Sequence, residues 1–238
     1  MANRSAQYGR ILGIQLLIAC GGVVFQTHAA DSIALGGAEV SPENSYLYAG
    51  VIRPLSGSRL GNGAVQRYWL DRSTYRYDGS GGKIDAEAWG VEAALGYQGS
   101  REQTWWGAYA GVMYRDTHLS PDDPTSKARG GKVRGKVQLE GETPLSASWR
   151  INGNASYVFG QQNYWVRGRL LYRLAGGIST GPELLTQGDP DYKVNQVGWV
   201  VVGLRPAPDV DLGLKLGAKK LRGESTRPYL GIEASHPF

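Results

Sequence analysis

The sequence predicts an all-β fold, an antiparallel up-and-down outer-membrane β-barrel of about 12 strands, with about 10 strands as the alternative. Three observations predict it. Apolar and polar side chains alternate along most of the chain after Asp31, charged residues occupy the polar side in mid-strand, and the chain ends in an alternating apolar run closed by Phe238. The 35 Gly, 14 Tyr and 7 Trp, against only 3 Phe, are typical of a sheet with aromatic belts at two membrane interfaces.

The first residues have the form of a secretory signal peptide. Arg4 and Arg10 precede an apolar run from Ile11 to Phe25, and small residues follow in Thr27-His28-Ala29-Ala30. The run is shorter than the roughly 20 residues that a membrane-spanning helix needs. We therefore expect residues 1–29 to be removed and residues 30–238 to form one barrel domain in the outer membrane.

Cys20 leaves one alternative open at this end. The stretch Leu17-Ile18-Ala19-Cys20 also fits the pattern at which a bacterial lipoprotein is cut and acylated on its new N-terminal cysteine. Apolar residues continue through Val23-Val24-Phe25, where a lipoprotein carries a polar tether, and this favours the later cleavage site. After cleavage there the mature chain has no cysteine and no disulfide.

The strands follow from a side-chain period of two. In the clearest run Val133, Val137 and Leu139 alternate with Arg134 and Lys136, so one face is apolar and the other polar. The same reasoning gives twelve strands: Ser32 to Glu39, Tyr46 to Arg53, Ala64 to Tyr77, Ala86 to Gln98, Thr104 to Arg115, Lys132 to Glu142, Trp149 to Phe159, Tyr164 to Leu174, Ile178 to Gln187, Val194 to Leu204, Val210 to Lys220 and Tyr229 to Phe238.

Charges in mid-strand distinguish a membrane barrel from a soluble sandwich. A hydrophobic core cannot hold many charged side chains, whereas the polar lumen of a membrane barrel can. We expect Glu183 to pair there with Arg167 or Arg169 on the preceding strand, as a structural ion pair in preference to a ligand contact. The expected lumen-lining residues are Glu92, Arg134, Lys136, Glu140, Arg150, Arg167, Arg169, Glu183, Lys215 and Glu233.

Two further features agree with a membrane barrel. Aromatics gather near strand ends, where we expect them to anchor at the lipid interface, although luminal rings that stack on sugars are the alternative; the pairs are Tyr46 and Tyr48, Tyr68 and Trp69, Trp105 and Trp106, and Tyr164 and Trp165. The connections alternate between short turns, expected on the periplasmic side with both termini, and outer loops, of which His118 to Gly131 is the longest.

The last strand carries the most specific signal. Leu230, Ile232, Ala234, His236 and Phe238 occupy alternate positions and end on an aromatic residue, a pattern read by the outer-membrane assembly machinery. Pro237 lacks an N–H group, so we expect the closing strand to lose pairing in its last two residues.

The order of several short segments resembles one family. The chain contains YLYAGVIRPLSG, GNGAVQRYW, YRYDG, GVEAALGYQ, YAGVMYRD, QNYWVRGRL, STGPELLTQGD and the final Phe238. Together they resemble the cellulose biosynthesis protein BcsS family over nearly the whole mature chain, from about Asp31 to Phe238. The resemblance implies an accessory role in making or exporting bacterial cellulose, with cellulose or cellulose synthase subunits as partners. It brings no catalytic residues.

Candidate sites outside the lumen are few. The mature chain has two histidines, His118 and His236, which argues against a zinc site, and no cofactor is expected. His118, Ser120 and the acids Asp116, Asp122 and Asp123 lie at one outer loop and keep open a barrel enzyme that acts on lipid or polysaccharide. The Ser-Pro-Asp-Asp-Pro stretch is otherwise ordinary turn chemistry, and it lacks the pattern of a calcium loop.

The charge balance limits the partners. A formal net charge of +5, of which Arg4 and Arg10 leave with the signal peptide, is too small to indicate nucleic acid. Outer-membrane lipid is the expected partner of the apolar face. Three functions remain: an accessory barrel of cellulose biosynthesis or export, which we favour and expect to be non-catalytic, a barrel enzyme, and a structural scaffold that binds periplasmic synthase subunits.

Overall fold

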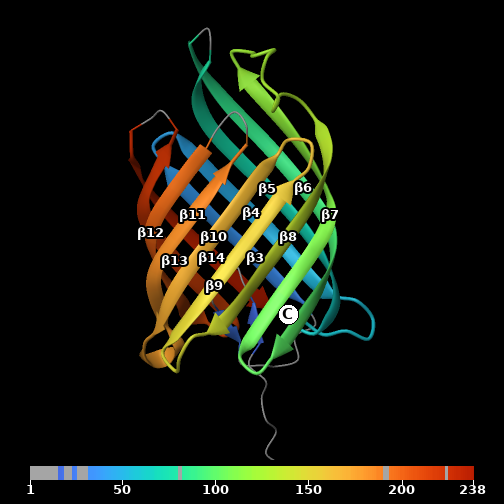
Figure 1. Ribbon diagram of the computed structural model, residues 1–238, viewed down its shortest axis with the longest axis vertical. Coiled ribbons are helices and arrows are strands. Elements are labelled where there is room, and N and C mark those ends of the chain that lie inside the picture. Colours follow the sequence, from blue (N-terminus) through green and yellow to red (C-terminus); the bar gives the residue numbers. More distant parts are fainter. Residues whose placement is uncertain (1–15, 19–22, 26–31, 80–81, 190–192, 223–224) are drawn as a thin grey trace, which may run out of the picture.

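The computed structural model describes residues 16–18, 23–25, 32–79, 82–189, 193–222 and 225–238. Twelve antiparallel strands, β3 to β14, form a closed barrel in which each strand pairs with its neighbours in the chain and β14 pairs with β3 (Figure 1). The predicted fold class and strand number are confirmed. The strands are β3 (Ile33–Ser41), β4 (Asn44–Pro54), β5 (Gly63–Gly79), β6 (Gly82–Arg101), β7 (Thr104–Ser120), β8 (Lys132–Pro144), β9 (Trp149–Val158), β10 (Asn163–Arg173), β11 (Ser179–Gly188), β12 (Lys193–Ala207), β13 (Val210–Leu221) and β14 (Arg227–Pro237).

The two ends of the barrel differ. One end, here called the turn end, carries short connections such as 102–103, 145–148 and 208–209, the start of β3 and the end of β14. The opposite end, the loop end, carries the longest connection between strands, 121–131. This is the asymmetry that the sequence predicts.

Three strands extend beyond the rest at the loop end. β6 has 20 residues and β5 and β7 have 17 each, so they rise above the barrel rim in Figure 1. At this end the strand predicted as Ala86 to Gln98 begins too late, and the strand predicted as Thr104 to Arg115 ends too early. The inner face of the extension is apolar, because Ile84, Ala86 and Leu119 form a buried cluster against Tyr75 and Tyr77, and this packing continues the sheet past the rim.

The alternation in sequence becomes two faces of one wall. Apolar side chains on the outside include Val133, Leu139, Leu184, Leu216 and Leu230, of which Val133 is 71% exposed. Charged and amide side chains alternate with them and are buried inside the barrel. Only a lipid environment makes such an outer face favourable, because contiguous apolar patches of this extent are rare on soluble proteins.

The aromatic residues divide between the two faces, which corrects the prediction that the strand-end pairs all anchor in lipid. Tyr68 and Trp106 are exposed outside, and Tyr97 with Trp106 and Trp149 with Tyr172 form outer pairs near the turn end. Their chain neighbours face inward because consecutive side chains point to opposite faces. The inward-facing members are Tyr46, Tyr48, Trp69, Trp105 and Trp165.

Pro237 does not interrupt the pairing of β14 with β3, whereas pairing with β13 stops at Ser235, so the expected loss of pairing in the last two residues of the closing strand occurs on the β13 side only. The N–H of Phe238 donates to Ser32 at 2.9 Å, and the N–H of Ser32 donates to Phe238 at 3.0 Å. In an antiparallel ladder, residues that bond across it alternate with residues whose backbone groups point the other way. Because Phe238 bonds to Ser32, the backbone nitrogen of Pro237 points away from β3 and toward β13. The β13–β14 ladder already ends at Asp211 and Ser235, so no partner is lost by the missing N–H.

The predicted signal peptide, residues 1–29, lies outside the described residues except for two short strands, β1 (Leu16–Ile18) and β2 (Val23–Phe25), which pair with each other. Cys20 is not among the described residues. In the described part of the chain no helix is long and apolar enough to cross a membrane.

Candidate functional site: the barrel interior

Arg169 on β10 is a fully buried charge inside the barrel. Its guanidinium lies 2.5 Å from a carboxylate oxygen of Glu183 on β11 and 2.8 Å from one of Glu233 on β14, and the side chains of Arg169 and Glu183 are fully buried. From the sequence we expected Glu183 to pair with Arg167 or Arg169, but the contact of Arg169 with Glu233 was not predicted. Because β11, β12 and β13 lie between β10 and β14, this contact spans the interior instead of following the wall.

Further charges join this group from the neighbouring strands. Arg167 lies 3.2 Å from Glu233. Lys215 on β13 lies 2.8 Å from Glu39 on β3, and Lys219 lies 3.0 Å from the same carboxylate. Each carboxylate in this group thus meets at least one cation, which offsets the cost of burying it.

A second group of charges lies on β5 to β8. Glu92 on β6 accepts a hydrogen bond from Lys136 at 2.5 Å and lies 3.6 Å from Arg67 on β5. Near the loop end Arg115 pairs with Asp71. Arg134 is half-buried on the same side, diagonal to Arg115 across the β7–β8 ladder, and within the described residues it forms no salt bridge.

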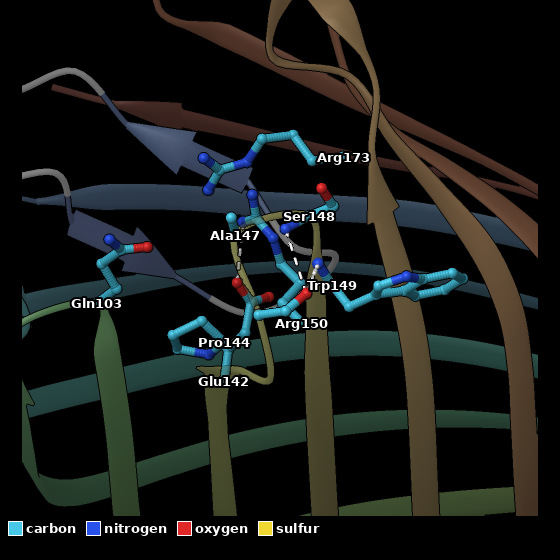
Figure 2. Close-up of a pocket in the computed structure, with 9 residues that line it drawn as sticks. Gln103, Glu142, Pro144, Ala147, Ser148, Trp149, Arg150 and Arg173 are labelled. Carbon is cyan, nitrogen blue, oxygen red and sulfur yellow. Dashed lines mark hydrogen bonds and ion pairs between the residues drawn. The ribbon is translucent and has the colours of Figure 1, made fainter.

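Two glutamates on β8 bind amides and an arginine of β9. Glu140 accepts hydrogen bonds from Tyr109 at 2.7 Å and from Asn154 at 3.1 Å. Glu142 pairs with Arg150 at 3.0 Å near the turn end. Figure 2 shows this pair side by side, with the Trp149 ring pointing away from it, beside a cavity of about 10 Å³, about the smallest space that holds one water.

The expected lumen-lining residues are therefore half-buried or buried on the inner face, and nine of the ten are joined in ion pairs or hydrogen bonds with other inner residues. The alternation in sequence would also have found Arg67, Asp71, Arg115, Glu142 and Lys219, which occupy the same face. It could not give partners that come from strands distant in the chain, such as Glu233 for Arg169.

The inward-facing aromatics lie flat on glycines of the neighbouring strand. A Cβ atom on Gly50 would clash with the Trp69 ring, and one on Gly37 would meet the Tyr48 ring at 2.7 Å. The two rings also stack on each other, with centroids 4.7 Å apart and planes 12° apart. Glycine at both positions thus lets the two rings pack against the inner wall, and the Arg67 guanidinium covers the Trp69 ring at 4.5 Å from its centroid.

Several buried polar atoms on β9 and β10 make no hydrogen bond among the described residues. They are Nη2 of Arg150, Oδ1 of Asn152 and of Asn154, and Nε and Nη2 of Arg167. Asn152 faces Arg169 and Asn154 faces Arg167 across the β9–β10 ladder, so these atoms form one patch. Such groups are rare in folded proteins, because leaving one unpaired costs about 1–3 kcal/mol.

Part of the interior is apolar, although the sequence predicts a polar lumen. Ile33, Leu35, Ile52 and Val65 pack with Leu60, which comes from the 55–62 connection at the turn end. Gly61 in the same connection donates its N–H to Gln98 at 2.7 Å. This connection therefore packs into the turn end of the barrel.

The residues of the possible enzyme site lie on the outer face of the loop-end extension. His118 and Ser120 on β7 line a cavity of about 450 Å³ with Asp85, Glu87 and the 42–43 turn. Within the described chain no hydrogen bond joins His118 to Ser120, and Glu87 is the residue opposite His118 in the ladder. The pairing that would activate a serine is not formed here.

The acids of the 121–131 connection hold the loop together. Asp123 accepts hydrogen bonds from the Thr125 hydroxyl at 2.6 Å and the Tyr77 hydroxyl at 3.0 Å. These bonds lower the pKa of Asp123, with that from Thr125 contributing most. Asp122 pairs with Arg129 instead. Across the described residues no group of three or more histidine, cysteine or carboxylate side chains is placed to hold a metal ion.

Comparison with protein families gives one match. The model of the family described as cellulose biosynthesis protein BcsS matches residues 33–238, which is the whole barrel from the start of β3. This is the family that the sequence resembles. No curated protein matches the chain.

Solved structures of outer-membrane barrels are similar to this one. The KdgM porin has a TM-score of 0.54 at 10% identity, over 87% of this chain and 99% of that chain. The COG4313 outer membrane channel from Pseudomonas putida F1 has a TM-score of 0.54 at 14% identity, over 89% and 97%. The β domain of the Bordetella autotransporter Brka has a TM-score of 0.52 at 16% identity, over 89% and 100%. At these identities the likeness shows the barrel fold.

Proposed function

This chain belongs to the cellulose biosynthesis protein BcsS family, and we propose that it is a non-catalytic accessory barrel of the outer membrane that acts in the making or export of cellulose. The observation that carries the proposal is the family match across all twelve barrel strands. The apolar outer face supports insertion in a membrane. A barrel of this fold is also compatible with a polysaccharide ligand, since the KdgM porin has been solved in complex with disordered oligogalacturonate.

The mature protein in this proposal is residues 30–238. Cleavage after residue 29 leaves the start of β3 close to the new N-terminus, on the turn end, which the proposal assigns to the periplasm. The partners are outer-membrane lipid on the outside, and cellulose or subunits of the cellulose synthase complex. The lumen-lining residues form the candidate contact surface for the polysaccharide.

The interior argues against export of the polymer through a wide, open pore. Arg169 meets Glu233 across three intervening strands, and Gln196 on β12 donates to Glu39 on β3 at 2.9 Å. Side chains thus reach into the lumen at mid-strand and narrow it, as expected for a barrel of this size. The proposed role is therefore guidance or attachment of the polymer at the outer membrane.

Deletion of the gene in a cellulose-producing host tests the proposal. We expect extracellular cellulose, measured as glucose released by cellulase, to fall and to be restored by the wild-type chain. His118→Ala and Ser120→Ala should restore it equally, because no chemistry at these residues is required. Unchanged cellulose in the deletion strain would contradict the accessory role.

The same experiment separates the two other functions. If either substitution abolishes cellulose while the barrel accumulates normally, the enzyme hypothesis is favoured, with the cavity lined by His118 and Ser120 as its site. If cellulose depends on the protein but only turn-end variants, for example in 145–148, lose it, the protein acts as a scaffold for periplasmic subunits.

A further inference from the structure

We propose that the outer face of the loop-end extension binds the phosphorylated sugar headgroup of a glycolipid in the outer leaflet of the membrane. The site is the cavity of about 450 Å³ between the 42–43 turn and the extended strands β5 to β7. This inference goes beyond the proposed function and takes from it only the orientation, with the loop end outside the cell. It is carried by the change from apolar to polar side chains along the outer face and by the mixed chemistry of the cavity wall.

The outer face of β5 to β7 changes character toward the loop end. The pairing of the strands aligns outward-facing residues in rows across the sheet. Leu70, Val91 and Tyr114 form one apolar row, each 44% to 50% exposed. The next row toward the loop end contains Trp89, half exposed, beside Arg72, whose guanidinium lies 5.5 Å from the centroid of the indole ring. Because tryptophan is enriched where acyl chains give way to headgroups, residues beyond this row lie at the level of lipid headgroups.

The outward side chains beyond this boundary are polar, and they line the cavity. The next two rows consist of Thr74, Glu87 and His118, followed by Arg76, Asp85 and Ser120. Ser45 on β4 borders the cavity from the other side, and its hydroxyl lies 2.8 Å from that of Thr74. Cations, carboxylates and hydroxyls are thus gathered in one cavity directly next to the apolar rows.

This combination of groups fits a sugar that carries phosphate. Arg76 pairs with Asp85 at 2.6 Å, and Arg72, next to the cavity, pairs with Glu87 at 2.7 Å. All four side chains are at least 40% exposed, so these pairs are weak and a ligand can share their charged groups. Guanidinium groups bind phosphate, and carboxylates accept hydrogen bonds from sugar hydroxyls. Phosphate without a sugar would meet the carboxylates unfavourably.

The position of the cavity favours a sugar attached to lipid over a soluble one. Its volume is within the range of roughly 300–1,000 Å³ that is usual for ligand sites. Leu47 on β4 and Leu70 on β5 are 56% and 46% exposed on the same outer face, one row apart and next to the cavity on its turn-end side. Acyl chains in the hydrocarbon layer can contact these two residues while their headgroup occupies the cavity. A soluble polysaccharide would make no use of this apolar surface.

Lipid binding to the purified mature barrel tests the inference. The probes are lipid A, which is an acylated and phosphorylated glucosamine disaccharide, phosphatidylglycerol, which has phosphate and acyl chains but no sugar ring, and cellohexaose, which is a sugar without lipid. Native mass spectrometry of the barrel in detergent measures the bound lipid. We expect lipid A to bind at least about tenfold more tightly than phosphatidylglycerol, and cellohexaose not to displace it.

Matched variants locate the site. Thr74→Trp fills the cavity and should weaken lipid A binding about tenfold. Thr186→Trp makes the same change on β11 near the loop end but outside the cavity, and it should leave binding unchanged. Arg76→Ala removes a cation of the cavity wall and should also weaken binding. Arg129→Ala is its control, because Arg129 also forms an exposed pair with an acid but does not line the cavity.

Heat-modifiable migration on a gel shows whether each variant folds, and Arg76→Ala decides the matter if Thr74→Trp does not fold. The inference is wrong if lipid A binds no more tightly than phosphatidylglycerol, if cellohexaose displaces it, or if the cavity variants bind it as their controls do. These results leave the proposed role in cellulose untouched. Conversely, unchanged cellulose in the deletion strain would contradict the proposed function while tight, variant-sensitive binding of lipid A would still establish the glycolipid site.

Discussion

At the scale of single residues, the interior of this barrel depends on paired charges. Arg169 is fully buried and contacts two carboxylates, Glu183 and Glu233, from two different strands. Removing one member of a buried charged group leaves the others unpaired in a region of low dielectric, which is far more costly than losing an exposed pair. A charged residue therefore contributes more to the free energy of unfolding when it is paired inside the barrel than when it is paired at the surface.

Replacing Arg169 by Leu should lower the free energy of unfolding by about 3–5 kcal/mol, because Glu183 stays buried without its cation and Glu233 keeps only Arg167 and Lys215. Arg129→Leu is the matched control, since Arg129 pairs with Asp122 while both side chains are about half exposed; its effect should stay within about 0.5 kcal/mol. Urea unfolding in phospholipid vesicles measures both. Equal effects would show that Arg169 is not part of a buried network.

At the scale of the strand, the period of two sets which side chains meet lipid. On β8, Val137 is exposed outside, while Lys136 points inward and donates a hydrogen bond to Glu92. The two positions are adjacent in sequence and opposite in environment, and a shift of register by one residue would exchange them.

The same new side chain at these two positions should have opposite consequences. Val137→Arg places a charge on the lipid face and should cost roughly 2–4 kcal/mol near the bilayer midplane, so that less folded barrel accumulates in the membrane. Lys136→Arg keeps an inner cation opposite Glu92 and should accumulate like the wild type. Membrane fractionation and heat-modifiable migration measure both. Tolerance of Val137→Arg would mean that this face does not contact lipid.

At the scale of the whole molecule, the even number of strands and the uneven connections define two ends. The 121–131 connection and the extension of β5 to β7 lie at one end, and the start of β3 and the end of β14 at the other (Figure 1). Closure also leaves no free strand edge around the body of the barrel. The proposed orientation places the loop end outside the cell.

Cysteine labelling tests this orientation, because the proposed mature chain has no cysteine of its own. Lys127→Cys in the 121–131 connection should react with a membrane-impermeant maleimide on intact cells. Ala147→Cys at the turn end should react only after the outer membrane is permeabilised. Both side chains are exposed in the structure, so access to the reagent is the only difference expected. The reverse pattern would invert the barrel.

The sequence by itself determined the fold class, the twelve strands, the two ends and the family resemblance. These follow from local rules, the two-residue period, turn residues and the closing aromatic run, which need no knowledge of distant contacts. The alternation also placed the candidate residues on the polar face of their strands, Glu183 and Arg169 among them.

Only the tertiary structure decided what those residues contact. Arg169 and Glu233 are 64 positions apart in the chain and meet across the interior, and closure of the sheet brings β4 opposite β10. Local patterning also failed where a neighbouring strand set the outcome. β6 continued past the rim because its inner face found apolar partners, and Pro237 kept its pairing with β3 because its missing N–H faced the end of β13. Each depends on a partner that sequence order does not specify.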